Sequence, residues 1–260
     1  TDREITRPRA SWPLSSMVMS LSAESMEYRF RFRQMRFEGD ILSRTIRIGL
    51  PAGFQSIMYS LSNMLIQASV NRFGTDTVAS WVVLGKVDGI NWMILGALGI
   101  ASMTFVGQNY GAGRLDRIQK SLKLSLLIGL CISIVFGGAL LLFGWPLFGL
   151  FTSDDTVLAM SMQLLWYFAP FYWLFVPIEI ISGALRGMGD TLIPTIITAT
   201  GICVFRVAWI YTVVPLHNSM FTVSLSYPIS WVLTAIAFAI YYMIARKKLI
   251  ANAPKPRTAE

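Results

Sequence analysis

Long apolar segments dominate the chain from residue 50 onward. Six such segments, separated by short polar loops, cover residues 50–71, 78–106, 124–147, 157–185, 194–214 and 223–245. A helix of about 20 residues, rising 1.5 Å per residue, crosses a hydrocarbon core of about 30 Å. In lipid, a helix satisfies its own backbone hydrogen bonds. The pattern therefore predicts an all-α integral membrane protein, a bundle of six transmembrane helices.

The six spans form one predicted domain, residues 41–248, with a polar segment on either side. Residues 1–40 contain no apolar run long enough to cross a bilayer, and they end in YRFRFRQMRFEGD, where Arg alternates with aromatic residues. This alternation favours either an amphipathic segment on an anionic membrane surface or a solvated basic linker. Residues 249–260 are expected to form a polar tail.

Composition and charge agree with a membrane protein. The chain is 54% hydrophobic and 14% charged, whereas soluble domains carry about 25% charged residues. The net charge of +8 lies in short loops rather than on a soluble basic face, so we expect membrane lipid and no nucleic acid as a partner. Successive loops lie on opposite sides of the membrane, and the loops of one side contain a single basic residue, Arg72. The basic residues on the other side are Arg44, Arg47, Arg114, Arg117, Lys120, Lys123, Arg186, Arg246, Lys247 and Lys248. This asymmetry places both ends of the six-helix unit, and with them segments 1–40 and 249–260, in the cytoplasm.

The first span carries a polar stripe. Gln55, Tyr59, Asn63 and Gln67 are spaced four residues apart, so they share one face of a helix. Such a stripe is typical of the lining of a water-filled cavity. It is also typical of helices that hydrogen-bond to one another within a membrane. Both interpretations stay open.

Four charged residues lie inside the spans: Lys86, Asp88, Glu179 and Arg206. Each costs about 2.5–3.5 kcal/mol on insertion scales, so such residues are usually paired or functional. Lys86 and Asp88 are two positions apart and should point to different faces. Arg206 is predicted to pair with Asp88 or Glu179. The group is either a structural salt bridge or a set of carboxylates whose protonation or cation binding drives transport.

Glycine and proline predict irregularities in two spans. Gly85 and Gly89 flank the charges of the second span and are expected to weaken that helix. Pro170 and Pro177 predict a kink in the fourth. No nucleophile–base pair, metal cluster or cofactor loop is visible in the sequence, so neither an enzyme nor a bound cofactor is expected.

Three motifs resemble those of a known family. GLPAGFQ opens the first span, FVGQNYGAG follows the second, and EIISGALRGMGDT follows the fourth. The glycines of the last two motifs, residues 107–113 and 183–190, are expected to form loops with tight turns. In this order and spacing, the motifs resemble the C-terminal lobe of the MATE family of multidrug and toxin exporters, over about residues 28–250.

The resemblance implies a twelve-helix protein in which two six-helix lobes enclose a central cavity, with residues 1–40 acting as an inter-lobe linker. It implies an antiporter of the bacterial inner (plasma) membrane that exports organic cations and drugs as Na⁺ or H⁺ enters. Glu179 and Asp88 would couple the ion, with Na⁺ near Glu179, and Lys86 and Arg206 would tune them. Some relatives carry a carboxylate on the first helix, where this chain has Gln55 or Asn63. A missing N-terminal lobe, or a second copy, would complete the cavity.

Two alternatives remain beside this hypothesis. A lipid-linked saccharide flippase of a related superfamily would grip pyrophosphate with Lys86 and Arg206. A non-transporting truncated fragment is favoured by the first residue, which is Thr rather than Met.

Overall fold

The computed structural model of the protein describes residues 38–251. Internal contacts divide the chain into two units, Thr1–Ile46 and Arg47–Glu260. The predicted amphipathic segment and polar tail lie almost entirely outside the described residues. All packing reported below belongs to the second unit.

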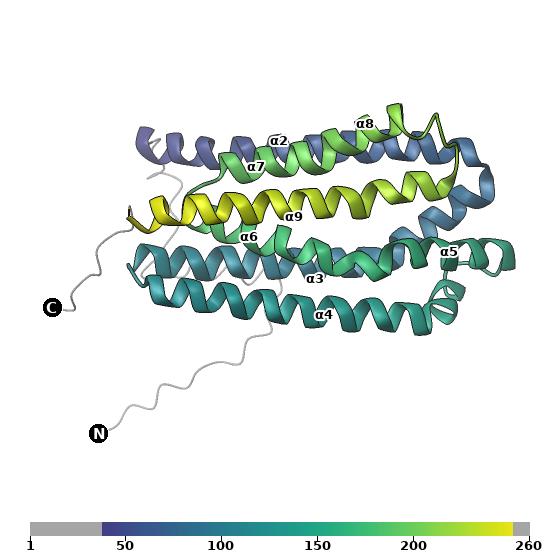
Figure 1. Cartoon of the computed structure of the whole chain (residues 1–260), viewed down its shortest axis with the longest axis horizontal. Helices are drawn as coiled ribbons and strands as arrows, with labels where there is room; N and C mark the ends of the chain where they lie inside the picture. The colour runs from purple at the N-terminus through teal and green to yellow at the C-terminus, as the bar shows by residue number, and fades with distance from the viewer. Residues whose placement is uncertain (1–37, 252–260) are drawn as a thin grey trace, which may run out of the picture. The chain divides into compact units, whose positions relative to one another are not determined.

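The described residues are helical apart from short connections, which confirms the predicted all-α class (Figure 1). The long helices run alongside one another. In chain order the elements are α2 (Gly39–Val70), η2 (Asn71–Phe73), α3 (Thr75–Gly111), α4 (Leu115–Gly149), α5 (Asp155–Phe168), η3 (Ala169–Leu174), α6 (Phe175–Gly187), α7 (Leu192–Thr198), η4 (Ala199–Val204), α8 (Phe205–Thr212) and α9 (Met220–Ala251).

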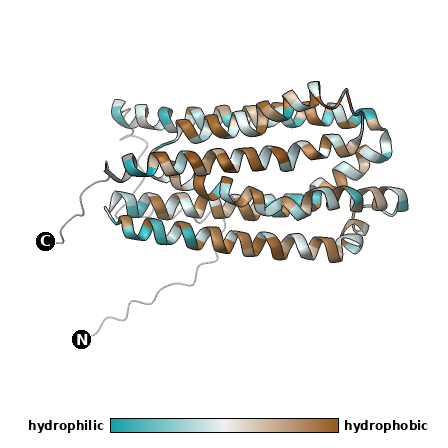
Figure 2. Ribbon diagram, in the orientation of Figure 1, coloured by the Kyte–Doolittle hydropathy of each residue, from teal (hydrophilic) through white to brown (hydrophobic). Residues whose placement is uncertain are grey.

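Five helical segments of the described chain are long and apolar enough to cross a membrane. They are Thr75–Gly111, Leu115–Gly149, Asp155–Gly187, Leu192–Thr212 and Met220–Lys247. The remaining predicted span lies in α2, a helix of 32 residues that carries the polar stripe. Figure 2 shows apolar residues along the middle of α4 and α9, and hydrophilic residues where α3 passes into α4. The structure is that of an integral membrane protein.

Two of the predicted spans are irregular. The fourth is interrupted by the 3₁₀ turn η3, which contains Pro170, as expected of an irregularity there, whereas Pro177 lies inside α6. The fifth contains a π-helical segment, η4, that the sequence did not reveal; it ends directly before Phe205. The predicted weakness at Gly85 and Gly89 is wrong, because α3 continues unbroken through both. A continuous helix keeps backbone groups satisfied where no water is available.

Glycines bring α3 and α6 into backbone contact. A Cβ atom added at Gly183 would strike the carbonyl oxygen of Gly99, and one added at Gly187 would strike the carbonyl oxygen of Met103. Ser102 Oγ donates to the carbonyl oxygen of Ile180 at 3.2 Å across the same contact. Small residues allow membrane helices to approach this closely.

The expected loops at 107–113 and 183–190 are therefore mostly helical, which corrects the prediction. Gly107, Gly183 and Gly187 lie inside α3 and α6, where they act in packing. The turns use only Gly113 (φ 70°) and Gly189 (φ 91°), a backbone conformation that favours glycine.

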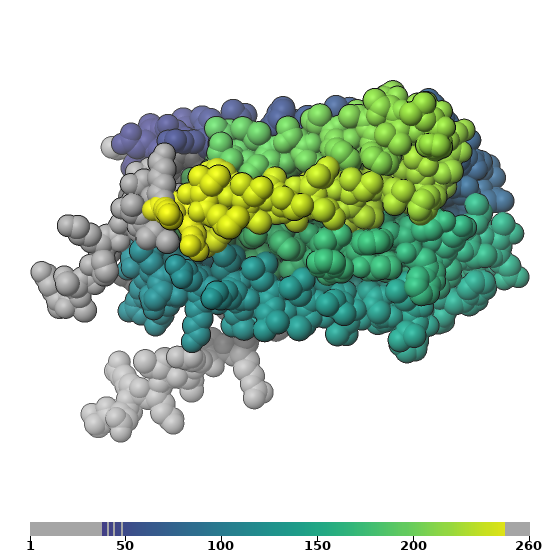
Figure 3. Space-filling view, viewed as in Figure 1, coloured from purple at the N-terminus to yellow at the C-terminus, as the bar shows by residue number. Residues whose placement is uncertain are grey.

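The C-terminal helix α9 packs between other elements. It contacts α6 on one side and α7 and α8 on the other, as the space-filling view shows (Figure 3). Its Trp231 and Phe238 are fully buried. A second apolar cluster contains Ile66 and Val70 of α2, Ile210 and Val214 near α8, and Val223 of α9. This cluster fixes the C-terminal half of α2 against α8 and α9.

We predict that Gly183→Ala destabilises the protein by about 1–3 kcal/mol, because its methyl group has to displace the α3 backbone. Gly138→Ala is the matched control, since Gly138 also lies in a helix but faces open space; it should be neutral or slightly stabilising. Thermal unfolding in detergent measures both. Equal melting temperatures for the two variants would contradict the close α3–α6 contact.

Candidate functional site

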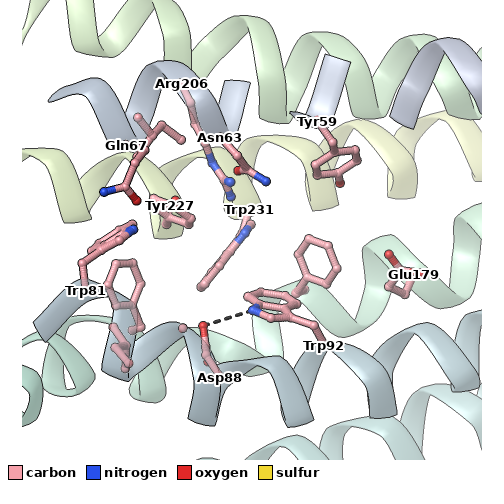
Figure 4. A pocket seen from close by; sticks show the side chains of 15 residues that line it. Tyr59, Asn63, Gln67, Trp81, Asp88, Trp92, Glu179, Arg206, Tyr227 and Trp231 are labelled. Carbon is pink, nitrogen blue, oxygen red and sulfur yellow. Dashed lines mark hydrogen bonds between the residues drawn. The ribbon is translucent and has the colours of Figure 1, made fainter. Parts of the chain in front are cut away.

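A cavity of about 460 Å³ lies among the helices. Its volume falls in the range of small-molecule sites. Residues of α2, α3, α5, α6, α8 and α9 line it (Figure 4). They are Tyr59, Asn63, Ile66, Gln67, Trp81, Leu84, Gly85, Asp88, Trp92, Phe168, Phe175, Glu179, Arg206, Tyr227 and Trp231.

The α2 wall is formed by part of the predicted polar stripe. Tyr59, Asn63 and Gln67 line the cavity, and Gln67 donates to Asn71 Oδ1 at 2.9 Å. Gln55 is not among the lining residues; instead its Oε1 accepts a hydrogen bond of 2.7 Å from Arg186 Nη2 of α6. Three residues of the stripe therefore line the cavity, and the fourth, Gln55, forms a hydrogen bond between helices.

Aromatic rings form much of the remaining wall. The rings of Trp92 and Phe175 lie edge to face with centroids 4.8 Å apart, and those of Trp81 and Tyr227 do so at 5.9 Å. Trp231 contacts Trp92 at 5.7 Å. Sequence reasoning missed this cluster, because its members come from three helices, α3, α6 and α9, that are far apart in the sequence.

Asp88 enters the cavity from α3. Its Oδ2 accepts a hydrogen bond of 3.0 Å from Trp92 Nε1, a pair one helical turn apart. Its Oδ1 is buried, and the hydroxyl of Tyr172 interacts with the carboxylate. An indole N–H and a phenol are thus the partners of this carboxylate.

Glu179 lies at a different level of the cavity. A Cβ atom added at Gly99 would come within 2.7 Å of Glu179 Oε2, so this carboxylate packs directly on the α3 backbone. Gly99 is 11 residues from Asp88, or about 16 Å along the helix axis. In Figure 4, Glu179 lies beyond Trp92 as seen from Asp88. One small cation cannot contact both carboxylates, since ligand distances are about 2.0–2.6 Å.

Arg206 is 4% exposed and projects from α8 into the cavity. Its Nε donates to Ser230 Oγ at 3.0 Å, and its Cζ lies 3.8 Å from the centroid of the Tyr227 ring. These contacts differ from the predicted ion pair with Asp88 or Glu179. A hydroxyl group and an aromatic face take the place of the carboxylate.

Lys86 does not share the cavity. Its side chain is exposed, and its Nζ lies 5.3 Å from the centroid of the Phe151 ring. As their spacing predicts, Lys86 and Asp88 point to different faces of α3. A long amphipathic side chain can reach past apolar surface in this way.

The lining offers an unusual chemical combination: aromatic faces, two carboxylates at separate levels and one guanidinium. Within residues 38–251, no three His, Cys, Asp or Glu side chains come close enough together to hold a metal ion. A flat ligand could stack on the rings, and ionic groups could bind at defined points of the wall.

Comparisons with known proteins agree with this architecture. Residues 51–212 match the family model described as MatE. Probable multidrug resistance protein YoeA of Bacillus subtilis is 26% identical over 226 residues, which cover 83% of this chain and 47% of YoeA. Probable multidrug resistance protein NorM of Thermotoga maritima is 25% identical over 161 residues, covering 62% of this chain and 35% of NorM.

A solved structure, a crystal structure of MATE in the bent conformation, has the same fold. Its TM-score is 0.78 at 16% sequence identity, over 90% of this chain and 53% of that chain. The chain thus spans about half the length, or less, of the relatives it matches.

We predict that Trp92→Phe costs about 1–3 kcal/mol of stability, because it removes the indole donor that satisfies Asp88. Trp81→Phe is the matched control, as Trp81 makes ring contacts in the described part of the chain. Both variants lose similar ring area, so the difference between their melting temperatures isolates the hydrogen bond. If Trp92→Phe lowers the melting temperature less than Trp81→Phe does, the hydrogen bond to Asp88 does not stabilise the protein as predicted.

Proposed function

Because the chain belongs to the MATE family, we propose that it works as one lobe of a transporter that exports drugs and organic cations in exchange for Na⁺ or H⁺. The observation that carries the proposal is the aromatic cavity with carboxylates at two levels. Aromatic faces attract flat cations, and intramembrane carboxylates are typical of ion-coupled carriers.

A second six-helix lobe would complete the cavity on the side of α2. Apolar residues of α2, among them Phe54, Ile57 and Met64, are exposed, which suits contact with lipid or with another lobe. That lobe is either an N-terminal one or a second copy of this chain. The two lobes would rock around the cavity, so that it opens to one side of the membrane at a time. The basic loops support an inner-membrane orientation with both ends of the unit cytoplasmic.

Ion coupling would use the carboxylates separately. Asp88 has Trp92 and Tyr172 as its partners, and Glu179 lies about three helical turns away, against Gly99. Binding of Na⁺ or H⁺ at either carboxylate would favour the conformation in which that charge is best neutralised. A ligand shifts such an equilibrium only through its different affinities for the two states.

The flippase alternative is less well supported. It would require a cationic cavity for pyrophosphate, but the lining contains Arg206 and two carboxylates, and Lys86 lies outside it. Neither the family relationship nor the described lining of the cavity supports an enzymatic function.

We predict that Glu179→Gln abolishes gradient-driven efflux of a fluorescent organic cation from proteoliposomes, because the amide cannot exchange a proton or balance a bound cation. Asp88→Asn should weaken it too. Lys86→Gln is the control, since Lys86 lies outside the cavity, and it should retain the wild-type rate. Circular dichroism checks that each variant is folded. Full coupled efflux by both carboxylate variants would refute these roles.

A further inference from the structure

Arg206 has more hydrogen-bond donors than the structure uses. A guanidinium carries five N–H donors, and the described part of the chain accounts for one of them, from Nε to Ser230. The Tyr227 ring covers one face of the group, but it lies against the π surface and does not accept the in-plane N–H bonds. Four donors on the two Nη atoms remain.

These donors lie at the cavity wall. Arg206 is one of the lining residues, and in Figure 4 its guanidinium end reaches from α8 toward Asn63 and Trp231. The Asp88 carboxylate already binds Trp92 and comes from the opposite wall. A buried charge without full compensation is unstable. An occupant with acceptor oxygens would satisfy the free donors.

We propose that Arg206 forms an anion subsite, which binds the carboxylate, sulfonate or phosphate oxygens of a flat aromatic ligand. The planar fork of a guanidinium binds such groups through two parallel hydrogen bonds. Ser230 and Tyr227 hold the fork in place from one edge and one face. The Trp231 ring lies 5.9 Å from Arg206 Cζ, and the indoles of Trp81 and Trp92 line the same cavity. These rings offer surfaces for the ligand's ring.

The inference deepens the proposed function and rests on it, because it assumes that the cavity holds a transported compound. It extends the substrate class. A cavity built only for organic cations gains nothing from a buried cation in its wall. With Arg206 present, aromatic compounds that carry an anionic group should bind better than their neutral counterparts.

Three probes that share one ring system test this subsite: 1-naphthoate, neutral 1-naphthamide and 1-naphthylmethylammonium. Equilibrium binding is measured with purified protein in lipid nanodiscs, after subtraction of uptake by empty nanodiscs. We expect the protein to bind naphthoate about tenfold more tightly than naphthamide, the difference that one charge-assisted hydrogen-bonded pair provides. In Arg206→Gln, this preference should fall to less than about twofold, with naphthamide affinity unchanged.

Arg186→Gln is the matched control, since Arg186 bonds Gln55 outside the cavity lining, and it should keep the preference. If Arg206→Gln does not fold, Arg206→Lys carries the test: it keeps the charge but loses the fork, so the preference should shrink without vanishing. An unchanged preference in Arg206→Gln would overturn the inference, and so would equal or absent naphthoate binding by the wild type. If the wild type binds naphthoate but not naphthylmethylammonium, the result would count against the organic-cation function while supporting the subsite.

Discussion

The close backbone contact between α3 and α6 determines how the two carboxylates of the cavity lie relative to each other. Gly99, Gly183 and Gly187 leave no side chain between the two helices, so α6 lies directly on α3. Glu179, one turn before Gly183, is thereby pressed against Gly99 with its carboxylate at the edge of the cavity. Asp88 lies about three turns away on the same α3 helix. A larger residue in this contact would separate the helices and move both carboxylates relative to each other.

Asp88 and Arg206 are compensated in different ways, and neither forms an ion pair with the other. An indole N–H binds one oxygen of Asp88, whereas a hydroxyl group and an aromatic face accompany Arg206. Opposite charges in a low-dielectric interior attract strongly when they meet. Here the aromatic side chains lie between them instead. The charges are kept available to a ligand or ion, at a cost in stability that a purely structural core would avoid.

Much of the fold could be predicted from the sequence. Apolar length revealed the spans, Pro170 predicted the interruption between α5 and α6, and the period of four placed Tyr59, Asn63 and Gln67 on one face. These features depend on local periodicity and backbone chemistry. The helical packing role of Gly107, Gly183 and Gly187 could not be predicted in this way, because a glycine in a turn and one in a helix contact look alike in a single sequence.

The site was only partly predictable for a related reason. Local sequence indicates which residues are polar, but tertiary packing decides their partners. Gln55 bonds Arg186, which is 131 positions away, and Arg206 meets Ser230 and Tyr227 on another helix. The aromatic wall gathers Trp81, Trp92 and Trp231 from distant segments. No spacing rule separates these rings from those that face lipid.

The transport proposal is tested most directly by flux across a membrane. Purified protein would be reconstituted into liposomes loaded with a fluorescent organic cation, and Na⁺ and H⁺ gradients would be imposed separately. The proposal predicts efflux that depends on at least one inwardly directed gradient and stops when that gradient is collapsed. Circular dichroism would check that the protein is folded. An efflux rate that is the same with either gradient as with no gradient would contradict the proposal.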